Sequence, residues 1–297
     1  MTQFISMKVM TAAAVVTAGA IGCSSAMQAS HQAAPSVQTD SVTAPSLGRR
    51  VAYNVVLPAG YDASRRYPVL WLLHGYGGNK DDWLRLTDLV EQVTRYPFIV
   101  VLPSAENSWY VNSPTKSDAA YETFMTVDLY NDVIRRFGVD TTRQAIAGLS
   151  MGGYGAVMLG LRHPYRYRFV GGLSSALSIL DPIGKGDTVM WNVGGKSMIV
   201  AFGADLAAAA VQYDPLRVVA APQAGGRQYF FLAAGENDGF RSFLPASRAF
   251  ADSLRLRGIP YEYHELPGGH TWSFWKMELA PMLASAWRVL GMDTQHR

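Results

Sequence analysis

From Arg50 onward, short apolar runs alternate with longer stretches in which apolar residues recur every three or four positions. The short runs are typical of strands buried in a parallel sheet, and the longer stretches are typical of amphipathic helices. The predicted strands cover 50–58, 67–75, 98–105, 143–150, 168–176, 228–235 and 261–269. The predicted helices cover 79–94, 119–137, 151–162, 244–257 and 272–290. This alternation predicts an α/β fold, with a mostly parallel twisted sheet and helices on both of its faces.

Two segments depart from this alternation. Residues 180–226 are less regular, and we expect an insertion over the carboxyl edge of the sheet, where open α/β sheets bind ligands. Residues 23–48 are rich in Ser, Ala, Thr and Pro and show no periodicity, which is typical of a flexible tether. The sequence therefore predicts one folded domain over 49–297, preceded by a tether.

Composition and charge narrow the possible functions of this domain. Of 297 residues, 49% are hydrophobic and 16% are charged, which is enough apolar material for a sizeable core. The net charge is only +3, and the basic residues are scattered, with pairs such as Arg65–Arg66 and Arg135–Arg136 rather than a basic face. Because nucleic-acid binding needs such a face, we expect no nucleic-acid partner. The oligomeric state cannot be read from these features.

The first residues have the layout of an export signal. Lys8 precedes an apolar, alanine-rich run that ends in small residues before Cys23, the only cysteine of the chain. The stretch "AIGC" resembles the lipobox of bacterial lipoproteins, although leucine is usual where Ala20 stands. We therefore expect a signal peptide over 1–22, lipid on Cys23 and a place in the cell envelope. The alternative is an ordinary signal peptide cut after Ala26 or Ala29, which gives a secreted protein.

The sequence "GLSMG" places Ser150 between a predicted strand and a predicted helix. This G-x-S-x-G context holds a serine on a strained turn, so that its hydroxyl projects from the sheet edge. Glycines at 148 and 152 leave room for the close backbone approach that such a turn requires. Taken alone the pentapeptide is a weak signal, since glycine-rich bends often contain serine.

A nucleophilic serine needs a base and an acid that orients the base, and in this fold class they follow in the order Ser, Asp or Glu, His. His270 lies in a glycine-rich loop after a predicted strand, which suits the base. Asp238 is our choice of acid, with Glu236 as the alternative at the same strand end. The stretch "NDG" could also be a simple turn. No metal ion or cofactor is implied.

Two backbone N–H groups are needed to stabilise an oxyanion. Met151 directly follows the serine, and Tyr76 lies in the loop "HGYGGN" after an early strand, so we expect these two donors. His74 is expected to order this loop by hydrogen bonding. The alternative is that the loop is a simple strand-to-helix turn without a role in catalysis. Trp109 and Trp272 follow strands at the same edge, and we expect them to line a substrate pocket, although such aromatic residues often serve only packing.

These residues carry a resemblance to a known family. The stretches "LLHGYGG", "NSWYVN", "AGLSMGGYGA", "GENDGF" and "GGHTWSFW" resemble the putative-esterase family of α/β-hydrolases, and the resemblance spans Tyr53 to Leu290. That family includes feruloyl and acetyl-xylan esterases, S-formylglutathione hydrolases and mycolyltransferases. The resemblance implies a triad of Ser150, Asp238 and His270, with Tyr76 and Met151 as oxyanion donors.

The expected function is that of a serine carboxylesterase acting through an acyl-enzyme on a short-chain or aryl (feruloyl-type) ester. The substrate would be a small molecule or a glycan-linked ester. One alternative is an acyltransferase that passes the acyl group to a sugar or lipid hydroxyl. Another is a binding lipoprotein without activity, because a fold does not guarantee a function. Membrane contact is expected only through lipid on Cys23.

Overall fold

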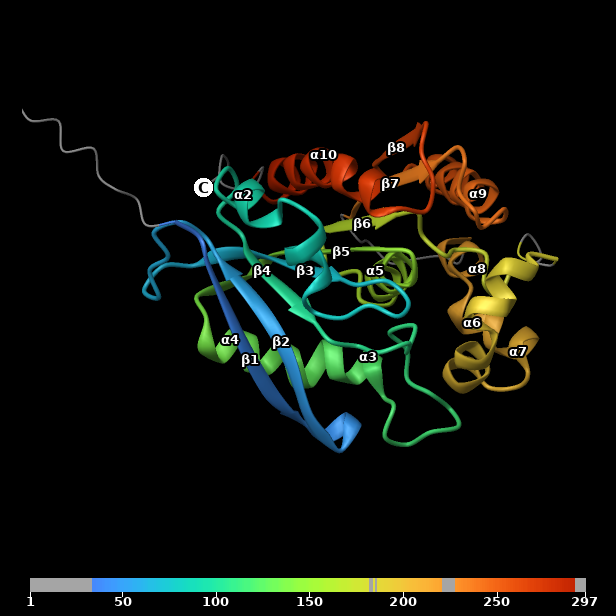
Figure 1. The fold of residues 1–297 in the computed structure, drawn as a ribbon, viewed down its shortest axis with the longest axis horizontal. Helices are drawn as coiled ribbons and strands as arrows, with labels where there is room; N and C mark the ends of the chain where they lie inside the picture. The colour runs from blue at the N-terminus through green and yellow to red at the C-terminus, as the bar shows by residue number, and fades with distance from the viewer. Residues whose placement is uncertain (1–33, 182–183, 185, 221–227, 292–297) are drawn as a thin grey trace, which may run out of the picture. The chain divides into compact units, whose positions relative to one another are not determined.

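The computed structural model describes residues 34–181, 184, 186–220 and 228–291 (Figure 1). Within these ranges one sheet has the strand order β1-β2-β4-β3-β5-β6-β7-β8. β1 and β2 pair antiparallel, β2 also lies antiparallel to β4, and all further pairs are parallel. The strands are β1 (Ser36–Ala44), β2 (Arg49–Leu57), β3 (Tyr67–Leu73), β4 (Ile99–Pro103), β5 (Val139–Leu149), β6 (Phe169–Leu173), β7 (Tyr229–Gly235) and β8 (Tyr261–Leu266).

Helices cover both faces of this sheet, as the alternating pattern predicts. One face packs against α1 (Asp82–Leu86), α2 (Leu89–Val93) and α10 (Trp272–Gly291). The other packs against α3 (Tyr121–Thr123), the π-helical turn η2 (Phe124–Asp128), α4 (Leu129–Arg136), α5 (Met151–Arg162) and α9 (Phe243–Leu256). In Figure 1, α10 and α2 lie on one side of the strands, and α3, α4 and α5 lie on the other.

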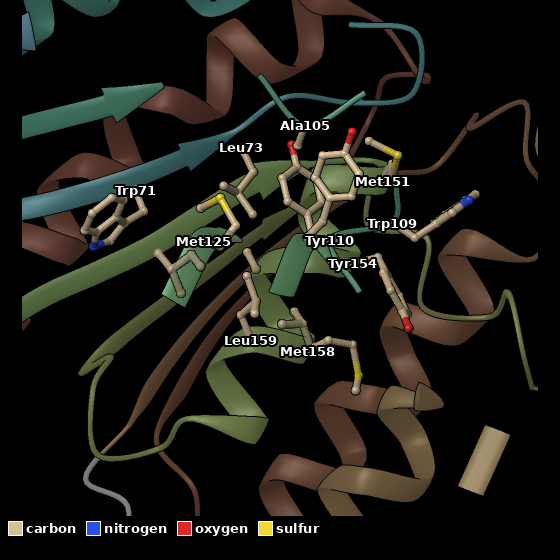
Figure 2. Packing of buried hydrophobic residues seen from close by; sticks show 14 of the residues in the cluster. Trp71, Leu73, Ala105, Trp109, Tyr110, Met125, Met151, Tyr154, Met158 and Leu159 are labelled. Atoms are coloured by element: carbon tan, nitrogen blue, oxygen red, sulfur yellow. The ribbon is translucent and has the colours of Figure 1, made fainter. Parts of the chain in front are cut away.

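The core divides into two clusters because successive strand residues point to opposite faces. In β3, Leu70 and Leu72 belong to the cluster under α10, whereas Trp71 and Leu73 belong to the cluster on the α4 and α5 side. Figure 2 shows this second cluster, where Trp71 and Leu73 lie among side chains of α5 and the turn η2. All of these side chains are buried, so the sheet carries its functional loops on a rigid base.

The predicted strands and the α/β fold are confirmed, and the differences have local causes. The helix expected over 79–94 is broken into α1 and α2 at Thr87. The Thr87 hydroxyl donates to the Trp83 carbonyl at 2.5 Å and accepts from the Leu89 N–H at 3.2 Å. It thereby replaces backbone hydrogen bonds that a continuous helix would need.

The tether expected over 23–48 is wrong for its second half. Ser36–Ala44 form strand β1, which pairs with β2 along its whole length, and a 3₁₀ turn over Pro45–Leu47 joins the two strands. Because β1 is an edge strand, only Val42 and Ala44 are buried and the remaining positions can be polar. Such a strand has a linker-like composition. The part of the expected tether over 23–33, like the expected signal over 1–22, lies outside the described residues.

The segment expected to be irregular is largely helical. It contains α6 (Thr188–Phe202), α7 (Leu206–Tyr213) and α8 (Pro215–Ala220). Asp187 and Asp205 cap the first two of these helices by accepting from backbone N–H groups. Among the described residues no single helix is long and apolar enough to span a membrane. α6 and α7 together would pass by length and composition, with a 78° bend between them.

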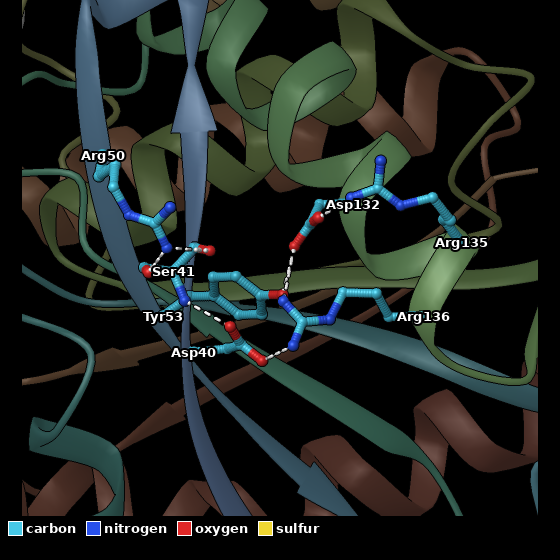
Figure 3. A network of polar contacts seen from close by, with 7 residues as sticks. All are labelled: Asp40, Ser41, Arg50, Tyr53, Asp132, Arg135 and Arg136. Atoms are coloured by element: carbon cyan, nitrogen blue, oxygen red, sulfur yellow. Dashed lines mark hydrogen bonds and ion pairs between the residues drawn. The ribbon is translucent and has the colours of Figure 1, made fainter.

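A polar network fixes the β1–β2 ribbon to α4 (Figure 3). The hydroxyl of Tyr53, a fully buried residue of β2, donates to Asp132 at 2.6 Å. Asp132 also pairs with Arg135 and Arg136, and Arg136 reaches across to Asp40 on β1. Burial and the neighbouring Asp132 carboxylate raise the pKa of Tyr53, so the phenol stays neutral and remains a donor.

We predict that Tyr53→Phe lowers the free energy of unfolding by about 1–2 kcal/mol, because it removes one hydrogen bond to a buried carboxylate without leaving a cavity. Urea unfolding of the variant measures this loss. Tyr96→Phe, at a half-buried tyrosine whose ring packs on Trp287, is the matched control and should change stability by less than about 0.5 kcal/mol. Equal stability of Tyr53→Phe and the wild type would show that the network does not hold the ribbon.

Candidate active site

Ser150 occupies a strained turn between β5 and α5. Its backbone angles are φ 53° and ψ −118°, a region that L-residues rarely adopt and that costs roughly 1–3 kcal/mol. Hydrogen bonds on both sides hold the turn. The Ser150 N–H donates to the Leu173 carbonyl at 2.9 Å, and its carbonyl accepts from Tyr154 and Ala176. The serine is therefore fixed by β6 as well as by its own helix.

Glycines around Ser150 are required by close backbone contacts. A Cβ on Gly152 would lie 2.4 Å from the His74 carbonyl oxygen and 2.6 Å from that of Leu73. A Cβ on Gly148 would lie 2.5 Å from the backbone of Gly152. Real side chains do not tolerate such distances, so the first turn of α5 can rest on the end of β3 only with glycine at these positions. The structure thus confirms that Gly148 and Gly152 are needed for close backbone approach, as the sequence motif predicts.

His270 connects Ser150 to an acid. Its Nε2 lies 2.9 Å from the Ser150 Oγ, and its Nδ1 lies 2.9 Å from Asp238 Oδ2. The other oxygen of Asp238 accepts from the Phe240 N–H at 2.8 Å, and the carboxylate is almost fully buried. The rings of Phe240, Phe243 and Trp275 lie edge-on to the imidazole, with centroids 4.7–5.5 Å away. The base thus has one orientation, set by its hydrogen bonds and its aromatic walls.

The remaining candidates for acid and base lie elsewhere. Glu236 is exposed, and its backbone N–H pairs with β8, so Asp238 rather than Glu236 meets His270. His163 contacts Glu122, and His264 contacts Glu278, both away from the serine. Among the described residues, no three His, Cys, Asp or Glu side chains are grouped so that they could hold a metal ion.

The loop after β3 lies against the serine. Gly75, Tyr76, Gly77 and Gly78 line the same cleft as Ser150. α5 begins at Met151, so its first N–H groups have no acceptor within the helix and its positive end faces the serine. The structure thus places Tyr76 and Met151, the two expected donors, on the two segments that flank the nucleophile.

His74 orders this loop, as expected. Its Nε2 accepts from the Ala105 N–H at 2.9 Å, which leaves the proton on Nδ1 to donate to the Gly75 carbonyl at 2.8 Å. The ring is buried, and burial lowers the pKa of His74; the Gly75 carbonyl and the charge of Asp82 oppose this only in part. A neutral imidazole therefore joins the loop to the residues after β4.

The cleft beside Ser150 has a volume of about 350 Å³. Its walls are mainly apolar and aromatic, formed by Tyr76, Leu86, Val193, Phe240, Trp272 and Trp275. Trp272 thus lines the cleft as expected, with its ring edge-on to Trp83 and Trp275. Val193 comes from α6, so the insertion reaches the carboxyl edge of the sheet.

Trp109 does not line this cleft, and that expectation is wrong. Its side chain is 4% exposed and packs against Tyr76, Tyr154 and Phe202, while its Nε1 donates to Ser197 Oγ at 2.9 Å. Figure 2 shows Trp109 beside Tyr154 in the packed cluster. The tryptophan lies behind Tyr76 because the chain turns inward at positive φ there.

Sequence reasoning missed four wall residues of the cleft. One of them, Leu86, lies at the end of α1, next to the break in the expected helix. Phe240 and Trp275 lie within the stretches "GENDGF" and "GGHTWSFW", and their spacing from Asp238 and His270 was the available signal. Val193 had no signal, because it lies on an insertion whose packing the pattern does not predict.

The parallel order of the central strands, the turn at Ser150 and the chain order Ser, Asp, His are those of serine hydrolases with the α/β-hydrolase fold. The family model described as "Putative esterase" matches residues 44–286, and the chain belongs to this family. The resemblance seen in the sequence is thereby confirmed, as is the assignment to enzymes that act on carboxylic esters.

The individual proteins that the chain resembles are esterases and acyltransferases. An acetyl esterase of Caldicellulosiruptor saccharolyticus is 32% identical, over 73% of this chain and 82% of that protein. A diacylglycerol acyltransferase/mycolyltransferase Ag85B of Mycobacterium intracellulare is 26% identical, over 95% of this chain and 93% of that protein. A solved ferulic acid esterase superposes with a TM-score of 0.72 at 25% identity, over 86% of this chain and 99% of that one.

We predict that His74 makes stability depend on pH. A histidine whose pKa is lowered by folding contributes stability that is complete above its unfolded pKa, near 6.5, and that is lost as pH falls below it. Between pH 7.5 and 5.5 the wild type should lose on the order of 1 kcal/mol more than His74→Gln, which keeps a donor and an acceptor but does not titrate. Urea unfolding at both pH values measures the difference, and parallel pH profiles would contradict the assignment.

Proposed function

We propose that the chain hydrolyses carboxylic esters with Ser150 as nucleophile, His270 as general base and Asp238 as the orienting acid. The observation that carries this assignment is the continuous hydrogen-bonded path from the Ser150 hydroxyl through both imidazole nitrogens to a buried carboxylate. The path lies at the cleft, with one face of the serine open to it. These are the relations that nucleophilic catalysis by serine requires.

Each group has a defined task in this mechanism. His270 Nε2 takes the hydroxyl proton as Ser150 Oγ attacks the ester carbonyl, while Asp238 holds the Nδ1–H and stabilises the imidazolium. The N–H groups of Tyr76 and Met151 receive the oxyanion of the tetrahedral intermediate, and each such donor is worth about 10²–10³ in rate. His270 then protonates the leaving alcohol, and water cleaves the acyl-enzyme by the same steps.

The cleft supports a short or flat acyl group. Its volume of about 350 Å³ and its walls of Tyr76, Trp272 and Trp275 suit an acetyl or a cinnamoyl-type group rather than a long chain. The acetyl esterase and ferulic acid esterase among the similar proteins support the same two classes. The alcohol part would be a small molecule or a sugar hydroxyl of a glycan, which the open side of the cleft can accommodate.

Acyl transfer is the second candidate. The observation that favours it is the mycolyltransferase relative, which matches this chain over almost its full length. Both reactions pass through the same acyl-enzyme and differ only in whether water or a second alcohol attacks it. Mass spectrometry of the products, with and without a polyol such as trehalose, separates the two.

We predict that the wild type hydrolyses p-nitrophenyl acetate and methyl ferulate and that Ser150→Ala retains less than about 0.1% of kcat. A fluorophosphonate probe should label Ser150 in the wild type and leave the variant unlabelled. Ser175→Ala, at a buried serine beside Gly153, is the matched control and should keep most of the activity. An unlabelled, inactive wild type would favour a binding protein without catalysis.

We also infer that the chain is exported and carries lipid on Cys23. The support is the layout of the first 23 residues, a lysine followed by an apolar, alanine-rich run that ends at the cysteine. Because β1 begins at Ser36, only about a dozen residues separate it from Cys23, a reach of at most ~40 Å. The domain would then work close to the membrane surface.

Cys23→Ser should abolish incorporation of labelled palmitate in a bacterial host and move the protein from the membrane to the soluble fraction. Ser150→Ala should keep the label, because its change lies in the folded domain. Undiminished labelling of Cys23→Ser would contradict lipid attachment at this residue and leave the ordinary signal peptide, cut after Ala26 or Ala29, as the route of export.

A further inference from the structure

The loop that follows β4 is strained at three positions. Glu106, Trp109 and Tyr110 have φ values of 47°, 57° and 59°, although none of them is glycine. Together with Ser150 and Ser174 they are the non-glycine residues with positive φ in the described part of the chain. Such strain persists only where the surrounding structure enforces it, and it concentrates at functional sites. The mechanism above assigns no task to this loop.

The strained loop contacts the Tyr76 loop at four places. The Ala105 N–H donates to His74 Nε2 at 2.9 Å, and the Tyr110 hydroxyl donates to the His74 carbonyl at 3.0 Å. These two contacts fix the residues before Tyr76. On the other side, the Gly77 N–H donates to Asn107 Oδ1 at 2.6 Å. The rings of Tyr76 and Trp109 also contact each other, with centroids 6.2 Å apart.

The contacts before and after Tyr76 differ in what surrounds them. His74 and Tyr110 are buried and held by the core, so the amino-terminal side of the loop cannot move independently. Gly77 is exposed, has φ +72°, and a Cβ built on it would meet nothing within 4 Å. A glycine in such open space samples many backbone conformations. The hydrogen bond to Asn107 therefore restricts the side of Tyr76 that packing leaves free.

We propose that Asn107 is a positioning residue for the oxyanion site. Its side-chain carbonyl fixes the Gly77 N–H and with it the peptide plane that follows Tyr76. The plane before Tyr76, which carries the Tyr76 N–H, is held through the Gly75 carbonyl by His74. With both planes held, Tyr76 cannot rotate between them, and its N–H keeps one direction. This inference rests on the proposed function, because it assigns Asn107 a task only if Tyr76 supplies an oxyanion donor. Asn107 itself does not line the cleft or touch Ser150.

The backbone that carries Asn107 is held rigidly through Trp109. Trp109, two residues after Asn107, is held from the far side by the hydrogen bond from its Nε1 to Ser197 Oγ at 2.9 Å. Its ring also lies close to Gly194, where an added Cβ would be 3.1 Å away. Trp109 is packed between α6 and Tyr76. Because Asn107 is only two residues away, its backbone is held in place by this packing. A preorganised donor of this kind stabilises the transition state more than the bound substrate.

The experiment compares Asn107→Leu, Asn107→Ala and Asn107→Asp with the wild type. The first two remove the acceptor, and the third keeps an acceptor at the same place. With p-nitrophenyl acetate, Asn107→Leu and Asn107→Ala should lower kcat about tenfold and change KM by less than about twofold. Asn107→Asp should keep at least about a third of kcat, because the half-exposed position screens its charge. Asn131→Ala, at an exposed asparagine of α4, is the matched control and should behave as the wild type.

The inhibition constant of an alkyl trifluoromethyl ketone distinguishes a positioning role of Asn107 from a purely structural one. Ser150 Oγ adds to its carbonyl carbon, the serine proton passes to His270, and the resulting alkoxide occupies the oxyanion site. The inhibition constant should rise in Asn107→Leu by the same factor as kcat/KM falls, and the thermal unfolding midpoint should shift little. Unchanged kcat in Asn107→Leu, a loss confined to KM, or an equal loss in Asn107→Asp would overturn the proposal. A wild type that fails to hydrolyse the ester would instead overturn the proposed function.

Discussion

The contact between the first turn of α5 and the end of β3 is the constraint on which the site depends. Gly152 lies so close to the carbonyl groups of Leu73 and His74 that no side chain fits between them. This approach holds Ser150 and the loop that follows β3 together as one rigid unit. A shift of either element would be transmitted to the other through backbone atoms, which cannot rotate out of the way as side chains can.

Interactions with the neighbouring strand and helix offset the backbone strain at Ser150. β6 accepts the Ser150 N–H at Leu173, and the residues that follow, Met151 and Tyr154, are fully buried. A buried Met side chain contributes about 1.5–3 kcal/mol, comparable with the cost of the unfavourable dihedral angles. The same elements also direct the positive end of α5 at the serine. Local strain, core packing and electrostatics at this turn therefore favour one geometry.

The sequence predicts those parts of the molecule in which local pattern and tertiary environment agree. The continuous apolar runs of β3, β4 and β7 are buried on both faces, so their sequences identify them, and the Ser150 turn follows from the glycines that it needs. The sequence did not predict β1, because only two side chains of this edge strand are buried and its other positions are polar enough to resemble a linker. Trp109 was misplaced because its inward turn depends on strained dihedral angles that sequence does not encode. Asp238 was chosen from the sequence with Glu236 as the alternative, and the loop geometry brings Asp238 to His270.

Helix α6 connects the cleft wall to the loop of Asp238 and to the loop of Tyr76. Its N-cap, Asp187, accepts from the N–H and the hydroxyl of Ser242, at the start of the helix that follows Asp238 and Phe240. Farther along the helix, Ser197 holds Trp109, which supports Tyr76. Between these two anchor points, Val193 forms part of the cleft wall. A change in α6 that enlarges the cleft therefore bears on both the loop that carries Asp238 and the loop that carries Tyr76.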